Sequence, residues 1–523
     1  MRGVVAAGHP ASAHAGAQAL AAGGNAVDAM VASAFAASVA ESALTGPGAG
    51  GFILVRPPDG PAVVHDAFAA APGLGPEGRR LRPEMLDAFT VPFGDAEQVF
   101  HIGPASVAVP GFYRGLFEVW EHHGRLPLSD LVQPAVALAT DGVVLSTEVS
   151  YLHTILREML TWTPGAAAIY APGGILLGTG DRLRMPRLAE TLTELARTGC
   201  SALDPGGWLS RRVVDGLAPL GGLVTADDIA AYRVIPRTPW EVAFRGHRVL
   251  TNPPPSSGGV LIGAALATMD ARPATADPVA RACAMVDAGH RANELRCEEF
   301  VQRLGEPGFT GWFRERLQRG DAGSPSRGPA GTTHVSVIDA DGMIASTSSS
   351  NGAGSGVVID DLGFLLNNML GEEDLNPGGF GRVEPGRRLT SMMAPTVILT
   401  PDGHPRVVIG SAGSNRLRSA ILQTTVNILD GGMDGIDAVE APRLHVEGGG
   451  VDVEGGVPEP VVQALDASGY ALRRWGGMNL FFGGVNAVGR ESTGLWGAGD
   501  PRRGGAAAAV NHRGEVIALS PRP

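Results

Sequence analysis

The residues best suited to chemistry lie at one junction, Gly331-Thr332-Thr333-His334, where a glycine-rich segment meets a run rich in hydroxyl side chains. Cleavage of the Gly331–Thr332 bond would give Thr332 a hydroxyl nucleophile and a free α-amino group on one residue. Such an amine has a reference pKa of about 7.7–8.0 and can act as a general base near neutral pH. This arrangement needs no lysine or histidine, although a Thr-Thr pair is also typical of an ordinary β-strand.

Other nucleophilic chemistries are excluded or disfavoured. The sequence contains no lysine, so all 41 lysine-plus-arginine positions are arginine. This excludes a side-chain Schiff base, a Walker-type phosphate lysine and a Ser-x-x-Lys acyl enzyme. No serine lies in a Gly-x-Ser-x-Gly elbow, which disfavours a conventional serine hydrolase.

Cofactor sites are also disfavoured. His122-His123 is the only adjacent histidine pair, and its segment is typical of a helix surface without further ligands at metal spacing. The glycines of 46–51 fit G-x-G-x-x-G, but a predicted helix precedes them and a predicted strand follows, the reverse of a dinucleotide site. We expect no metal and no organic cofactor.

Composition indicates a globular protein, with 523 residues of which 44% are apolar and 18% charged. The net charge of −12 and the absence of a long basic run argue against a nucleic-acid partner. Three cysteines, Cys200, Cys283 and Cys297, are too few for a disulfide framework. The N-terminal stretch does not read as a signal peptide, and the longest apolar run, Ala29–Ala40, is too short for a bilayer. We predict a cytoplasmic protein with no membrane partner.

Predicted helices and strands mix in both halves of the chain. Residues 11–40 are predicted to form a core helix with Asn25 as a cap, residues 52–55 a strand, and residues 80–330 mostly helix. Residues 318–331 should be an exposed loop. A hairpin is predicted from 332–339 to 343–348 around Asp341-Gly342, followed by strands at 396–399 and 406–409. This mixture predicts layered sheets covered by helices.

A series of motifs runs in order along the whole chain. The first are Gly24-Asn25-Ala26-Val27-Asp28-Ala29 and the glycine-rich turn before Phe52; the middle ones are Val109-Pro110-Gly111, Val132-Gln133-Pro134-Ala135 and residues 253–259. The last are Thr332-Thr333-His334, Leu365-Leu366-Asn367-Asn368, residues 389–392, Ala441-Pro442-Arg443 and residues 497–502. In these motifs the chain resembles the γ-glutamyltransferase family of N-terminal-nucleophile hydrolases.

The resemblance implies an α+β protein with a four-layer αββα fold. It also implies self-cleavage between Gly331 and Thr332, which would give a large subunit of residues 1–331 and a small subunit of residues 332–523. Together the two subunits would form one catalytic unit. We expect no nucleic-acid or membrane partner, and the substrate should be a small molecule.

Site roles follow from the same resemblance. Thr332 matches the family's nucleophile, and Thr333 lies where the family has a supporting hydroxyl. Gly413 and Ser414 match a glycine pair whose backbone N–H groups form the oxyanion hole. Ser414 departs from the pattern, although a backbone donor survives the change.

Four more residues match substrate-binding positions of the family. Asn351 matches a substrate-binding asparagine in a segment about two residues shorter than in bacterial relatives. Glu372 falls where an acid holds the α-amino group of the γ-glutamyl substrate. Thr390 and Ser391 match hydroxyls that hold its carboxylate.

One substrate-binding position does not match. The arginine that clamps the substrate α-carboxylate in the family is replaced by Phe68 in this sequence. Phenylalanine cannot replace a bidentate guanidinium–carboxylate pair. The sequence therefore predicts altered specificity.

The leading hypothesis is a self-processing hydrolase that uses Thr332 on an acyl bond of a small, amino-acid-derived metabolite. Three alternatives stay open at this point. The first is a true γ-glutamyl hydrolase or transpeptidase. The second is a carbon–carbon bond hydrolase in an antibiotic pathway, resembling atypical relatives, and the third is a non-catalytic scaffold that never cuts itself.

Overall fold

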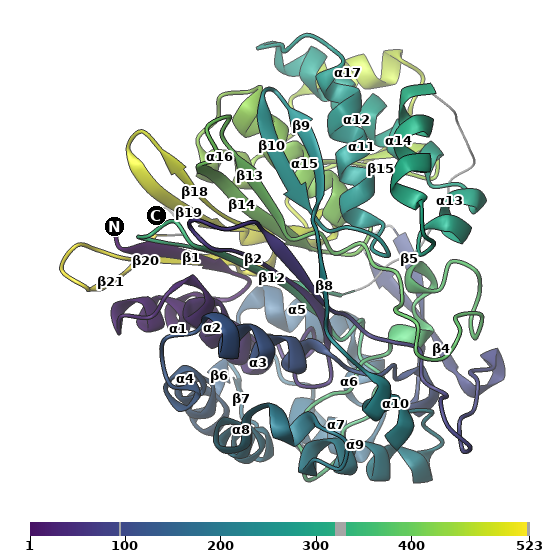
Figure 1. Cartoon of the computed structure of the whole chain (residues 1–523). Coiled ribbons are helices and arrows are strands. Elements are labelled where there is room, and N and C mark those ends of the chain that lie inside the picture. Colours follow the sequence, from purple (N-terminus) through teal and green to yellow (C-terminus); the bar gives the residue numbers. More distant parts are fainter. Residues whose placement is uncertain (94–95, 320–330, 520–523) are drawn as a thin grey trace.

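Two β-sheets lie face to face at the centre of the molecule, with helices on both outer faces (Figure 1). The computed structural model describes residues 1–93, 96–319 and 331–519. Strand β11 of one sheet contacts β14 and β18 of the other, which brings the two sheets together. This arrangement confirms the predicted four-layer αββα fold.

The larger sheet has eight strands and carries the Thr332 junction at one end of a central strand. Its order is β21 (Val516–Ala518), β20 (Ala506–Val510), β1 (Gly3–Ala7), β11 (Thr333–Asp339), β12 (Ile344–Ser350), β2 (Gly50–Arg56), β3 (Val63–Ala67) and β8 (Ile235–Arg237). The predicted hairpin is present as β11 and β12, which pair antiparallel with Val335 opposite Thr347. Gly342 makes the turn with φ of 84°, a conformation that favours glycine.

The smaller sheet has six antiparallel strands. Its order is β19 (Gly494–Gly499), β18 (Gly484–Glu491), β14 (Pro405–Ala412), β13 (Thr396–Leu399), β10 (His247–Thr251) and β9 (Trp240–Phe244). The predicted strands at 396–399 and 406–409 are therefore present as β13 and β14. Strand β14 ends at Ala412, directly before the predicted oxyanion residues.

Helices cover each sheet from outside. On the larger sheet these are α1 (Pro10–Ala21), α2 (Ala26–Ala40) and α3 (Phe112–His123), with α4 (Leu128–Asp141) and α8 (Pro186–Thr198) beyond them (Figure 1). On the smaller sheet these are α11 (Gly258–Asp270), α15 (Arg416–Leu429) and α16 (Gly435–Glu440), with α12 (Pro278–Leu295) and α17 (Glu459–Ala467) outside. All fifteen residues of α2 are buried because it lies between the sheet and further helices.

Shorter elements complete the two outer layers. The remaining helices are α5 (Thr147–Ile155), α6 (Arg157–Leu160), α7 (Pro164–Tyr170), α9 (Trp208–Leu217), α10 (Ala226–Ala231), α13 (Glu298–Arg303) and α14 (Phe309–Arg319). The remaining strands are β4 (Asp87–Phe93) with β5 (Ala96–Ile102), β6 (Val143–Val144) with β7 (Arg182–Leu183), and β15 (Leu444–Glu447) with β16 (Gly450–Val453) and β17 (Ala471–Arg474). None of the helices in the described part of the chain has both the length and the apolar character needed to cross a membrane.

Two sequence predictions need correction. Residues 11–40 form two helices, because Gly23 takes φ of 95° and Asn25 starts α2 with a capping box to Asp28. The stretch 80–330 also contains strands β4 to β10. Strand β10 joins the smaller sheet by pairing with β13 far along the chain, and β9 pairs with β10. Most of the loop predicted at 318–331 lies outside the described residues.

Candidate active site

Thr332 lies at the start of β11 and borders a cavity of about 30 Å³ between the two sheets. The side chain is almost fully buried, with 3% of the residue exposed. Thr333, Glu41 and Arg503 also line this cavity, and Leu44, Val149, Leu152 and Leu480 give it an apolar wall. Of the predicted site residues, Thr332 and Thr333 border it. The cavity thus offers space beside the predicted nucleophile.

A buried carboxyl group holds the residue next to the nucleophile. The Oγ1 of Thr333 donates a hydrogen bond to Oε2 of Glu41 at 2.6 Å, and Ser12 Oγ approaches the other carboxyl oxygen at 3.4 Å. Burial raises the pKa of Glu41 to about 7. The role of Glu41 could not be predicted from the sequence, because it is a single acid directly after a helix and lies 292 residues from its partner.

A second hydroxyl approaches the bond that is predicted to be cut. Ser350 Oγ donates a short hydrogen bond to the carbonyl oxygen of Gly331 and accepts one from the N–H of Gly352 at 2.7 Å. Ser350 ends β12, so the hairpin brings it beside the start of β11. A donor at this oxygen would stabilise the negative charge that develops when the carbonyl carbon is attacked. The role of Ser350 could not be predicted from the sequence, because it is one of several serines in the same strand.

The turn after Ser350 brings two predicted substrate residues together. Asn351 is fully buried, and neither its Oδ1 nor its Nδ2 has a hydrogen-bond partner in the described part of the chain. The N–H of Ala353 donates to Oε1 of Glu372 at 3.1 Å and to Oδ1 of Asn368 at 2.8 Å. Burial raises the pKa of Glu372 to about 8. The backbone two residues after Asn351 is therefore bonded to the buried carboxyl group of Glu372.

Gly413 and Ser414 form a sharp turn between β14 and α15. Their φ angles are 111° and 58°, so both have left-handed backbone, which is unusual for a serine. A Cβ on Gly413 would lie 2.8 Å from Cα of Gly483 and 3.2 Å from the Arg503 guanidinium, so glycine is required. This turn lies near the cavity, because Ala412 and Arg503 both line it.

The other three predicted substrate residues, like Asn351 and Glu372, are not among the residues that line this cavity. The ring of Phe68 stacks on Phe52 with centroids 5.2 Å apart, inside the apolar core. Ser391 Oγ accepts from the N–H of Met393 at 3.0 Å, and its carbonyl accepts from Ser257 N–H at 2.8 Å. Oγ1 of Thr390 is buried and has no partner within residues 1–93, 96–319 and 331–519.

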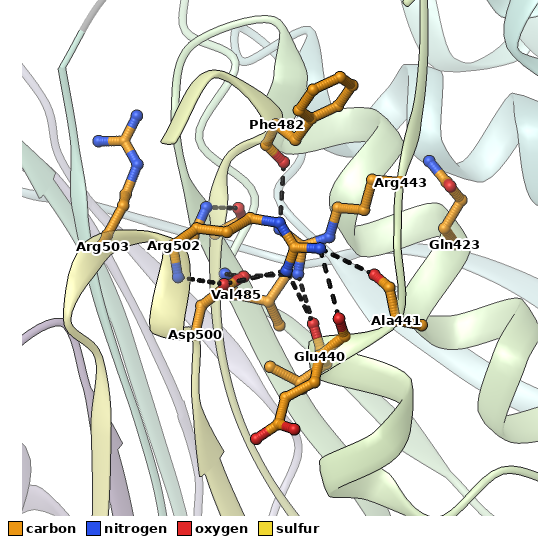
Figure 2. A network of polar contacts seen from close by, with 12 residues as sticks. Gln423, Glu440, Ala441, Arg443, Phe482, Val485, Asp500, Arg502 and Arg503 are labelled. Carbon is orange, nitrogen blue, oxygen red and sulfur yellow. Dashed lines mark hydrogen bonds and ion pairs between the residues drawn. The ribbon is translucent and has the colours of Figure 1, made fainter. Parts of the chain in front are cut away.

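A buried network of arginines and carboxylates supports the wall of the cavity (Figure 2). Arg443 and Arg502 both contact Asp500, at 2.5 and 3.1 Å, and Arg502 also pairs with Glu454 at 2.5 Å. Asp500 in turn accepts from the N–H of Val485 at 2.8 Å. Removing one partner from such a buried network would leave an uncompensated charge, which is costly. Because Arg502 directly precedes Arg503, these contacts hold the segment that carries Arg503 in place.

The described residues hold no cluster of three histidine, cysteine, aspartate or glutamate side chains that could bind a metal ion. The arrangement is therefore built from hydroxyl, carboxyl, amide and guanidinium groups around one threonine. These groups suit acyl transfer, in which a nucleophile attacks a carbonyl carbon and N–H or O–H donors stabilise the oxyanion.

Comparison with known proteins identifies the family. Residues 12–510 match the family model described as gamma-glutamyltranspeptidase. The chain is 35% identical to "Acylase ACY 1 proenzyme" of Pseudomonas sp. (strain SE83), over 93% of this chain and 89% of that protein. It is 29% identical to "Glutathione hydrolase proenzyme" of Bacillus subtilis (strain 168), over 97% of this chain and 92% of that protein.

A solved structure with the same fold agrees with this result. The crystal structure of cephalosporin acylase from Bacillus halodurans superposes with a TM-score of 0.80 and 26% identity, over 98% of this chain and 96% of that one. The resemblance seen in the ordered motifs is thus confirmed. The chain belongs to the gamma-glutamyltranspeptidase family and is an N-terminal-nucleophile hydrolase.

Proposed function

We propose that the chain cuts itself between Gly331 and Thr332 and then uses Thr332 to hydrolyse an amide bond of a small, amino-acid-derived acyl compound. The observation that carries this proposal is the hydrogen bond from Ser350 Oγ to the carbonyl oxygen of Gly331, the carbonyl of the peptide bond that precedes Thr332. The same proposal gives a large subunit of residues 1–331 and a small subunit of residues 332–523.

Self-cleavage requires only groups of this chain and water. The Oγ1 of Thr332 attacks the carbonyl carbon of Gly331, the C–N bond breaks, and the proton from the hydroxyl passes to the nitrogen. Water then hydrolyses the resulting ester, which frees the Gly331 carboxylate and restores the Thr332 hydroxyl. Ser350 stabilises the oxyanion of the first step. The word "proenzyme" in the names of both relatives agrees with such processing.

Hydrolysis of the substrate repeats this chemistry with the new α-amino group as general base. Thr332 attacks the acyl carbon, the amine of the substrate leaves with a proton, and water releases the acyl group from the enzyme. The backbone N–H groups of Gly413 and Ser414 are proposed to stabilise the oxyanion. Thr333 supports the position of Thr332 through its hydrogen bond to Glu41.

An acyl amide is preferred to a γ-glutamyl compound as substrate. Phe68 has no polar side chain, and its ring is packed in the core, so this position supplies no carboxylate clamp. The relatives named acylase, one acting on cephalosporins by its name, favour an N-acylated amine. Asn351, Glu372 and the hydroxyls of Thr390 and Ser391 are proposed to bind the polar part of the acyl group.

The first experiment is the intact mass of the purified protein beside Thr332→Ala. We expect two pieces meeting at Gly331–Thr332 in the wild type and one uncut, inactive chain in the variant. Ser349→Ala is the matched control, because Ser349 Oγ pairs with Thr45 Oγ1 at 2.7 Å and not with Gly331. If Thr332→Ala still splits at the same bond, the assignment of the nucleophile is wrong.

The substrate class is tested with the mature enzyme on three panels. These are N-acyl amides that include an acylated cephalosporin nucleus, a γ-glutamyl anilide, and compounds with a cleavable carbon–carbon bond next to a carbonyl. We expect the highest kcat/KM for an acyl amide. Faster turnover of the γ-glutamyl anilide, or turnover of the carbon–carbon panel alone, would contradict the amide assignment.

A further inference from the structure

The turn at Gly413–Ser414 holds a serine in a conformation that its side chain opposes. Among the described residues, Ser414 and Arg245 are the two that have a positive φ without being glycine. Left-handed backbone places Cβ against the following carbonyl, and glycine avoids this clash. An interaction of the Ser414 side chain must therefore offset the disfavoured geometry.

Asp374 provides that interaction. Ser414 Oγ donates to Oδ2 of Asp374 at 3.1 Å, and Nδ2 of Asn415 approaches Oδ1 of the same carboxylate at 3.4 Å. Asp374 is 2% exposed and Ser414 3% exposed, so water does not compete for these bonds. One buried carboxylate thus holds two consecutive residues of the turn.

The carboxylate is itself fixed from the other side. Arg296 lies 3.7 Å from Oδ1 of Asp374, and both side chains are almost fully buried. Asn415 has a second anchor, since its Nδ2 donates to Oε1 of Glu447 at 2.6 Å. Asp374 therefore connects the turn to Arg296, which directly follows α12, and it lies two residues beyond Glu372 on a short 3₁₀ turn.

We propose that Asp374 is a positioning residue for acyl transfer: through Ser414 Oγ it sets the direction in which the Gly413 and Ser414 N–H groups point. This inference rests on the proposed function, in which these two N–H groups face the oxyanion. Oxyanion donors act only when they are aligned before the reaction, so a small rotation of the turn weakens both at once. The family's glycine at this position adopts a positive φ freely and needs no side-chain hydrogen bond. The serine does need one, and Asp374 provides it.

A purely structural role for Asp374 gives a different expectation. If Asp374 serves only as the partner of Arg296, its loss lowers stability whatever residue stands at position 414. If it positions the turn through Ser414, the loss appears in kcat, and most of that loss disappears once the Ser414 hydroxyl is gone. The two roles therefore separate in a double-mutant cycle.

The test compares Ser414→Ala, Ser414→Gly, Asp374→Asn and the double variant Asp374→Asn/Ser414→Ala in the mature enzyme. We expect Ser414→Ala to lower kcat about tenfold, because misaligning an oxyanion donor produces part of the rate loss that removing the donor would produce. KM should stay within about twofold, since the ground-state acyl group makes little use of oxyanion donors. Asp374→Asn should cost a similar factor alone and little more in the Ser414→Ala background.

Ser414→Gly distinguishes the effect of the hydrogen bond to Asp374 from the effect of the positive φ. It removes the hydroxyl and also the Cβ that opposes the positive φ, so its thermal midpoint should exceed that of Ser414→Ala. Asp430→Asn is the matched control for loss of a buried carboxylate. The side chain of Asp430 is 1% exposed, pairs with Arg245 at 2.6 Å and lies at the far end of α15. This control should lower the thermal midpoint and leave kcat unchanged.

Two results would overturn the inference. One is a Ser414→Ala enzyme with wild-type kcat; the other is an equal loss from Asp374→Asn in both backgrounds. If Asp374→Asn fails to fold, the kcat of Ser414→Ala compared with that of the wild type still tests the inference. If the wild type hydrolyses no acyl amide, the proposed function fails, and the rate at which a fluorophosphonate labels Thr332 in the same variants tests the inference independently.

Discussion

Thr333 and Glu41 are joined by a 2.6 Å hydrogen bond that spans 292 residues of sequence. The bond joins the first residue of β11 to the residue that directly follows α2. Gly8 lies against both partners, since a Cβ there would stand 2.2 Å from Oε2 of Glu41 and 2.8 Å from Oγ1 of Thr333. The position of Thr332 therefore depends on packing in the N-terminal helical layer.

Gly8→Ala should displace the Thr333–Glu41 pair. The added methyl group overlaps the carboxyl oxygen, and such overpacking costs about 1–3 kcal/mol of folding free energy. Self-cleavage should slow as well, which mass spectrometry of fresh protein would show. Gly311→Ala is the control, because no atom lies within 4 Å of its Cβ position in α14. Equal behaviour of the two variants would contradict this account.

Glu41→Gln should change how stability depends on pH. Burial raises the pKa of the folded-state carboxyl to about 7 from its ordinary value of 4.5, so the folded protein binds this proton more tightly. Stability from this group is complete below pH 4.5 and falls as pH rises to about 7. The loss amounts to about 3 kcal/mol at 1.36 kcal/mol per pKa unit.

Thermal midpoints of wild type and Glu41→Gln between pH 4.5 and 8 would measure this pH-dependent loss of stability. The wild-type midpoint should fall relative to that of the variant across this range, because glutamine does not titrate. Other carboxyl groups cancel in the difference between the two curves. Parallel curves would show that Glu41 titrates normally in the folded protein.

Ser350→Ala should slow self-cleavage and leave the fold intact. The variant lacks the donor to the Gly331 carbonyl, and loss of one oxyanion donor costs about a hundredfold in rate. Precursor disappearance can be followed on denaturing gels after synthesis. Ser349→Ala, the neighbouring serine with its own partner Thr45, should process at the wild-type rate. Fast processing of Ser350→Ala would remove Ser350 from the mechanism.

Phe68→Arg should destabilise the protein without creating γ-glutamyl hydrolase activity. The ring is 1% exposed and stacks on Phe52, so a guanidinium there would be buried without a partner. We expect a cost of several kcal/mol, seen as a lower thermal midpoint, whereas Phe68→Leu should be mild. A stable Phe68→Arg enzyme that hydrolyses a γ-glutamyl anilide would show that this position opens to the substrate.

Local patterns predicted the parts of the fold that depend on neighbouring residues. Alternation and Asp341-Gly342 predicted the hairpin of β11 and β12, and Asn25 was identified as a cap because its side chain acts within three residues. Strand β10 was missed because its partner β13 lies far along the chain, with Ile398 opposite Val249, and β9 joins the same sheet only by pairing with β10. Periodicity within a segment carries no information about such pairing.

The same limit applies to the site. Thr332 could be predicted because its chemistry needs only one residue and a cut before it. Glu41, Ser350 and Asp374 could not, since each acts through a contact that the folded chain creates. Asp374 and Ser414 are 40 residues apart, and no spacing rule joins an acid to a serine at that distance.

The strand order of the larger sheet determines what a cut before Thr332 can do. Strand β1 lies between β20 and β11, and β2 pairs with β12, so strands from before and after the bond alternate. Two chains interwoven in this way cannot part without breaking the central ladders of the sheet. After the cut, refolding would require two separate chains to associate, so the lifetime of the mature protein would depend on its rate of unfolding.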